Sequence, residues 1–233
     1  MTFSIVAYDP KNGDFGVAVQ SKFLCVGQIV PWAKANVGAV ATQANVNTSF
    51  GPRGLELLEK GYTSEEVVAE LLKDDELKEQ RQLAVIDKSG IATPFTGSDA
   101  FYWAGHKAGK YYSCQGNILV DEKTVADMSN AFESTEGDLA DKLLAVMRAA
   151  DQPGRGDVRG KQSAAILIVR NKAKERAMDA GDRSKINEGD ATLIIDKQRE
   201  NGWEGTIQLQ FNRNCDLFYD ANKGPINYLE DTF

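Results

Sequence analysis

The chain has 233 residues, of which 42% are hydrophobic and 26% charged, a composition that excludes a disordered, collagen-like or coiled-coil protein. Its formal net charge of −7, without a long basic run, predicts that it binds neither nucleic acid nor an anionic membrane surface. Because the three cysteines are far apart and His106 is the single histidine, we expect no zinc site, and the absence of a signal-length or membrane-spanning apolar run predicts a cytoplasmic protein.

The start of the chain predicts a β-hairpin. Apolar and polar residues alternate on both sides of Asn12-Gly13, a dipeptide that tolerates positive φ in a tight turn. In this pattern Thr2 and Ser4 share one face of the first strand. The small residues at 37–42 then predict a strand that another element approaches closely.

Two helices are predicted next. Pro52 suits the first turn of one helix and Gly61 its end, because proline fits that turn and glycine accepts the left-handed conformation after a helix. Thr63 and Glu66 have the spacing of a capping box, so a second helix should begin after Thr63.

The middle of the chain returns to strands before a second helical pair. We expect a hairpin from Leu83 to Pro94, an aromatic strand and loop over 102–112, and a turn at 114–117. Helices should follow from Asp121 to about Phe132 and from Asp138 to Ala150.

The last predicted elements follow a glycine-rich loop at 154–160. Ser163–Val169 is a nearly continuous apolar run, which is typical of a strand covered on both faces. Strands are also expected at 191–196 and 206–211. Two sheets between two helical layers would bury all of these elements, so we predict an α+β fold, a four-layer αββα sandwich in a single domain over 1–233.

Several motifs give the chain a family resemblance. The segments M-T-F-S-I-V-A, G-V-A-V-Q-S-K-F, V-G-A-V-A-T-Q-A, G-P-R-G-L-E-L-L, C-Q-G-N-I-L and R-G-K-Q-S-A occur in this order. Over about residues 1–170 the sequence resembles the bacterial and archaeal domain-of-unknown-function family 1028. The resemblance implies a fold like that of the Ntn hydrolases, in which an N-terminal residue is the nucleophile. Residues 171–233 do not match the family's short closing segment and form a different closing element or a lineage-specific extension.

Thr2 is the candidate nucleophile. Removal of Met1 would leave Thr2 with a free α-amine beside its own hydroxyl, and an amine with a pKa of about 7.7–8.0 can accept the hydroxyl proton. Nucleophile and base would then belong to one residue, which suits a chain with one histidine. The alternative is that Thr2 is only a β-branched residue at the start of a strand.

The Ntn resemblance places further groups beside Thr2. Lys22, at the end of the second strand, could lower the pKa of the amine or hold a substrate carboxylate, and Ser163 could orient the amine. Backbone N–H groups at Thr42 and Gln43 could stabilise an oxyanion. The predicted substrate-binding residues are Ser4, Ser21, Gln43, Asn45, Asp157, Arg159 and Gln162. Each also has a structural alternative, such as capping a turn or pinning a loop.

The leading hypothesis is an amidohydrolase that cleaves a small amide or peptide-like bond. The alternatives are a non-catalytic protein that binds a ligand or partner in the same cleft and a hydrolase that depends on His106; Cys114 is expected to be structural. No nucleotide or metal motif is present, so we expect no cofactor and an unidentified small-molecule or peptide substrate. Aromatic residues among polar ones after Lys172 predict a homodimer or higher oligomer.

Overall fold

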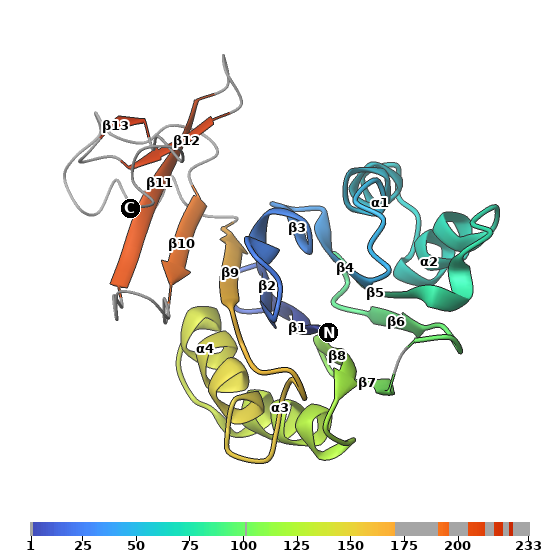
Figure 1. Cartoon of the computed structure of the whole chain (residues 1–233). Coiled ribbons are helices and arrows are strands. Elements are labelled where there is room, and N and C mark those ends of the chain that lie inside the picture. Colours follow the sequence, from blue (N-terminus) through green and yellow to red (C-terminus); the bar gives the residue numbers. More distant parts are fainter. Residues whose placement is uncertain are drawn as a thin grey trace.

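The computed structural model describes residues 2–100 and 102–170 in full and, beyond them, the backbone of 191–195, 205–212, 217–220 and 224–225. The described residues form antiparallel sheets and four α-helices (Figure 1). The protein is therefore of the mixed α and β kind that the sequence predicts.

Sheet A contains the first strands of the chain. Its members are β1 (Thr2–Asp9), β2 (Asp14–Ser21), β7 (Trp103–Gly109), β8 (Tyr112–Leu119) and β9 (Ser163–Val169). Their order is β7-β8-β1-β2-β9, and every neighbouring pair is antiparallel. The strand that begins with Thr2 is thus central, with a strand on each side.

Sheet B contains β3 (Pro31–Lys34), β4 (Gly38–Ala44), β5 (Arg81–Asp87) and β6 (Ala92–Thr96), in that order. The helices are α1 (Phe50–Glu59), α2 (Ser64–Leu72), α3 (Lys123–Ser134) and α4 (Leu139–Ala150), with short 3-10 helices at Val26–Gln28 and Lys78–Gln80. The backbone strands β10 (Ala191–Ile195), β11 (Gly205–Asn212), β12 (Leu217–Asp220) and β13 (Gly224–Pro225) form a third sheet.

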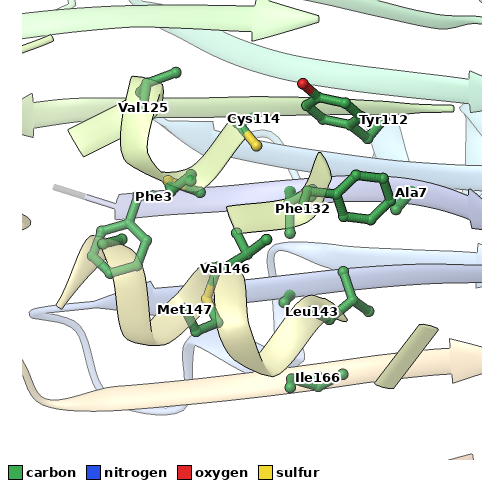
Figure 2. Packing of buried hydrophobic residues seen from close by; sticks show 14 of the residues in the cluster. Phe3, Ala7, Tyr112, Cys114, Val125, Phe132, Leu143, Val146, Met147 and Ile166 are labelled. Carbon is green, nitrogen blue, oxygen red and sulfur yellow. The ribbon is translucent and has the colours of Figure 1, made fainter. Parts of the chain in front are cut away.

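Alternation along β1 divides its side chains between two environments. Phe3, Ile5 and Ala7 pack with α3 and α4 in a cluster that includes Leu143 and Met147 (Figure 2). Since neighbouring residues of a strand point to opposite faces, Thr2, Ser4 and Val6 point away from these helices.

A second cluster lies where sheet A meets sheet B. Val6 and Val17 of sheet A pack there with Ala39, Ala41 and Ile86 of sheet B. The alanines confirm the close approach that the small residues at 37–42 predict. A third cluster, which joins sheet B to α1 and α2, contains Val40, Phe50, Val67, Leu71, Leu83 and Val85.

Local sequence signals account for several boundaries. Gly13 has a φ of 75° in the turn between β1 and β2, and Gly61 has a φ of 94° just after α1. Thr63 and Glu66 form both hydrogen bonds of the predicted capping box at the start of α2. The strands predicted at 191–196 and 206–211 correspond to β10 and β11.

Two local predictions are corrected. Residues 114–117 are not a turn but lie within β8, and the strand Pro31–Lys34 was not predicted. The helix expected from Asp121 begins at Lys123 after Glu122, although the Asp121 carboxylate accepts the Lys123 N–H. β9 packs on both faces, as predicted: Ile166 and Ile168 lie in the cluster under α3 and α4, and Ala165 and Val169 lie in the cluster between the sheets.

Candidate functional site

A cavity of about 230 Å³ lies where β1 begins and where β2 and β4 end. Its polar lining residues are Thr2, Ser21, Lys22, Gln43 and Arg159. Its apolar lining residues are Phe23, Val26, Ile29, Val30, Ala44 and Val46. The structure thus brings five of the predicted site residues to one cavity.

Thr2 lies at the polar end of this cavity. Its side chain faces sheet B, and only 8% of the residue is exposed. Thr2 and Ser21 are direct partners in the β1–β2 ladder, so their side chains share a face. Their hydroxyl oxygens, Oγ1 of Thr2 and Oγ of Ser21, are 3.1 Å apart, and either hydroxyl can be the donor.

Gln43, at the end of β4, contacts Thr2 from sheet B. Its Nε2 donates to the Thr2 carbonyl oxygen at 3.4 Å and to Oε1 of Gln82 at 2.7 Å. Its Oε1 is buried and accepts no hydrogen bond from the residues that the structure describes. A buried acceptor without a donor lowers the stability of the protein. Because Gln43 lines the cavity, a bound molecule with an N–H or O–H group could supply the missing donor.

Gln82 fixes which way the Gln43 amide points. Three oxygen atoms surround Nε2 of Gln82: Thr96 Oγ1 at 2.9 Å, Gly105 O at 3.1 Å and Gly116 O at 2.8 Å. Oε1 of Gln82 must therefore be the acceptor toward Gln43 and toward Nδ2 of Asn117 at 2.9 Å. A reversed Gln43 amide would set two oxygens against each other, so Oε1 of Gln43 is the atom left without a donor.

Ser4 belongs to the same buried polar layer. Its Oγ accepts a hydrogen bond from Nε2 of Gln115 at 2.7 Å, and Oε1 of Gln115 accepts one from Ser113 at 3.0 Å. Ser4 is two residues after Thr2 on the same face of β1, but it does not line the cavity. Gln82, Gln115 and Asn117 were not among the residues predicted from the sequence. A signal for Gln115 was present in the sequence: from Tyr112 to Gln115, polar residues alternate with Tyr112 and Cys114, which is typical of a strand. Asn117 continues the polar side of this pattern.

Two cationic side chains border the cavity. Arg159 donates its backbone N–H to Asp157 Oδ1 at 2.6 Å, and its Nε is 3.4 Å from the same oxygen. Oδ2 of Asp157 also accepts the Lys22 backbone N–H at 3.2 Å. Asp157 does not line the cavity itself; it ties the loop that carries Arg159 to the end of β2.

Ser163 bonds elsewhere. Its hydroxyl donates to the Phe23 carbonyl at 2.6 Å and accepts the Val26 N–H at 3.1 Å, which holds the loop after β2 against β9. The predicted oxyanion donor at Thr42 is also occupied, because its N–H donates to the Val30 carbonyl at 3.2 Å.

Two other predicted binding residues are outside the cavity lining. The Gln162 N–H donates to the Ser21 carbonyl at 3.0 Å, and Nδ2 of Asn45 donates to Oε1 of Gln80 at 2.9 Å. Both contacts hold backbone segments next to the cavity, which is the structural alternative considered for each.

The comparisons with known proteins follow the N-terminal part of the chain. The model of the Family of unknown function (DUF1028) matches residues 2–187. The chain belongs to this family. The match confirms the predicted resemblance and extends it beyond about residue 170, into residues that the structure does not describe. No curated protein matches the chain.

A solved structure of the DUF1028 family is similar to the chain. The crystal structure of protein SPO2555 from Silicibacter pomeroyi has 35% sequence identity and a TM-score of 0.68. The similarity covers 72% of this chain and 73% of that one. The two proteins therefore share the family and most of their length.

In this DUF1028 chain the two other candidates from the sequence, His106 and Cys114, do not line the cavity. Nδ1 of His106, on β7, is 2.9 Å from Thr96 Oγ1, and desolvation lowers the pKa of the imidazole. Cys114 lies fully buried among the residues that pack under α3 and α4 (Figure 2), and burial raises the pKa of its thiol, so the thiolate nucleophile is disfavoured.

None of the helices in the part of the chain that the structure describes has the length and apolar character needed to cross a membrane. No group of three or more His, Cys, Asp or Glu side chains among the described residues could hold a metal ion.

Proposed function

We propose that this DUF1028 protein is an Ntn-type amidohydrolase whose nucleophile is the hydroxyl of Thr2. The observation that carries the proposal is the position of Thr2: it begins the central strand of sheet A, faces a cavity between the sheets, and has its hydroxyl against that of Ser21. The succession of α1 and α2, sheet B, sheet A, then α3 and α4 supports a four-layer αββα sandwich of the Ntn kind.

The reaction uses groups that belong to Thr2 itself once Met1 has been removed. The hydroxyl oxygen attacks the amide carbonyl carbon while its proton passes to the α-amine. The same proton then moves to the amide nitrogen, the C–N bond breaks, and the amine leaves. Water attacks the resulting ester, gives its proton to the α-amine, and releases the acid with the Thr2 hydroxyl restored.

Lys22 and Ser21 assist in this proposal. The hydrogen bond with Ser21 holds the Thr2 hydroxyl in one orientation. Among the described residues no carboxylate pairs with the Lys22 ammonium, so its charge can favour the neutral α-amine and stabilise negative charge on the carbonyl oxygen.

A non-catalytic binding protein is the second candidate. The 8% exposure of Thr2 favours it, because a nucleophile must be reached by the carbonyl carbon. The same cavity would then hold a ligand without reaction, and Thr2 would be a structural residue of β1.

The test begins with the intact mass of the native protein. We expect Met1 to be absent and a β-lactone probe to label Thr2. Thr2→Ala should abolish the labelling, whereas Thr2→Ser should retain it, since serine keeps both the hydroxyl and the amine. His106→Ala should label like the wild type. Retained Met1, or unchanged labelling of Thr2→Ala, contradicts the hydrolase and leaves the binding protein.

A further inference from the structure

We propose that the cavity binds a small secondary amide that carries a carboxylate, of the N-acyl amino acid kind. Arg159 holds the carboxylate, the apolar wall holds the side chain, and Oε1 of Gln43 accepts the amide N–H. The inference names the substrate class of the proposed hydrolase and so rests on that function.

The charge of the lining favours an anion. Lys22 and Arg159 both line the cavity, and no aspartate or glutamate does, although the whole chain carries a net charge of −7. The Asp157 carboxylate accepts the Arg159 backbone N–H at 2.6 Å and also pairs with the Arg159 guanidinium, whose Nε lies 3.4 Å and whose Nη2 lies 3.5 Å from its oxygens. Both guanidinium contacts are longer than the roughly 2.7–2.9 Å of a charge-assisted hydrogen bond, and the Arg159 side chain is 45% exposed. Because a guanidinium carries five N–H donors, Arg159 can bind a ligand carboxylate while it stays beside Asp157.

The volume of the cavity and its apolar lining restrict the part of the ligand that carries no charge. A volume of about 230 Å³ is below the roughly 300–1,000 Å³ of sites for drug-sized molecules. The apolar wall consists of Phe23, Val26, Ile29, Val30, Ala44 and Val46. Aliphatic and aromatic side chains of this kind suit an aliphatic group of amino-acid size next to the charged end.

The buried side-chain oxygen of Gln43 is the reason that the ligand should carry an N–H group. Its Oε1 is buried, lacks a donor among the described residues, and cannot exchange places with Nε2 because Gln82 fixes the amide. Gln43 also donates to the backbone carbonyl of Thr2 at 3.4 Å, so the two residues are in contact. An amide whose carbonyl lies at the Thr2 hydroxyl has its own N–H beside Gln43, and that donor relieves the unfavourable burial only in the complex.

The experiment measures binding without chemistry. Full-length Thr2→Ala protein is titrated calorimetrically with N-acetyl-leucine, with neutral N-acetyl-leucinamide, and with the ester 2-acetoxy-4-methylpentanoate, which has oxygen in place of the N–H. We expect N-acetyl-leucine to bind and each analogue to bind about tenfold more weakly, because each lacks one charge-assisted or buried hydrogen bond. Equal affinity for the leucinamide overturns the carboxylate, and equal affinity for the ester overturns the role of Gln43.

Matched arginine variants locate the carboxylate. In the Thr2→Ala background, Arg159→Met should weaken N-acetyl-leucine about tenfold. Arg53→Met, on the exposed surface of α1 and outside the cavity lining, should leave the affinity unchanged. Inorganic phosphate that competes as well as N-acetyl-leucine would identify a general anion site and overturn the substrate class, as would an Arg159→Met variant with wild-type affinity.

The wild-type protein separates this inference from the proposed function. Release of leucine and acetate from N-acetyl-leucine supports both. Binding of N-acetyl-leucine without hydrolysis supports the ligand class and contradicts the hydrolase. Hydrolysis of other amides with no binding of N-acetyl-leucine contradicts the ligand class and retains the hydrolase.

Discussion

The hydroxyl oxygens of Thr2 and Ser21 lie 3.1 Å apart across the first hairpin, at the pair of residues where β1 begins and β2 ends. When Ser21 donates this hydrogen bond, the Thr2 oxygen keeps its own proton free for transfer. The ladder that pairs the two strands therefore also sets the orientation of the proposed nucleophile.

Ser21→Ala tests this relationship. Loss of one hydrogen bond of about 1 kcal/mol should slow labelling of Thr2 by the β-lactone about fivefold. The probe concentration at half-maximal rate should change less. Ser98→Ala removes a serine hydroxyl that bonds to Glu79 outside the cavity, and it should label at the wild-type rate. A Ser21→Ala rate equal to that of Ser98→Ala would remove Ser21 from the site.

Gln82→Leu tests the buried polar layer. Gln82 is fully buried, and leucine in its place would leave the amides of Gln43 and Asn117 without their shared acceptor. We expect the free energy of unfolding to fall by about 3 kcal/mol, measured in urea, because several buried groups lose their partners. Gln80→Leu removes only an exposed hydrogen bond to Asn45 and should cost less than about 1 kcal/mol. Equal losses in the two variants would contradict the structural role of Gln82.

Asp87 gives stability a dependence on pH. Burial alone would raise the pKa of its carboxyl group, but hydrogen bonds from Ser89, Ser64 and Ile91 together lower the pKa below its usual value. Because the pKa of Asp87 is lower in the folded than in the unfolded state, its ionised carboxylate stabilises the folded protein. This stabilisation is complete above about pH 4, the unfolded pKa, and is lost as the pH falls through the folded pKa. Asp87→Asn should therefore destabilise the protein by about 1–3 kcal/mol at pH 7. The difference from the wild type should narrow in acid denaturation below about pH 4. A difference that stays constant down to pH 3 would show that the charge of Asp87 is unimportant.

The predicted homo-oligomer is tested by light scattering. Sheet A ends in β7 and β9 and sheet B in β3 and β6, and an end strand whose edge no other element covers favours pairing with another chain. The aromatic side chains after residue 171, on which the prediction depends, lie outside the described residues. At micromolar concentration we expect at least twice the mass of one chain; a monomer would contradict the prediction.

Local patterns predicted the parts of the fold that local forces determine. Alternation around Asn12-Gly13 gave the first hairpin and the shared face of Thr2 and Ser4, and the spacing of Thr63 and Glu66 gave the start of α2. In each case the interacting residues are close in the sequence, so their spacing carries the information.

The parts that were missed depend on distant partners. Residues 114–117 resemble a turn because they are polar and contain Gly116, yet Gln115 and Asn117 find their hydrogen bonds in Ser4 and Gln82. Ser163 begins a strand, as expected, and pairs with Ser21, but its hydroxyl donates to the Phe23 carbonyl in the loop after β2. No spacing along the chain predicts such contacts.

The space between the sheets has two different ends. Around Val6, Val17 and Ile86 the contact is apolar, and the hydrophobic effect that stabilises it has no preferred direction. At the other end, directional hydrogen bonds join the sheets, from Gln43 to the Thr2 carbonyl and between Gln82 and the Gly116 carbonyl and Asn117. A shift of one sheet by one residue would break them all. The side-chain amides therefore fix the position of one sheet relative to the other, at the end where Thr2 begins β1.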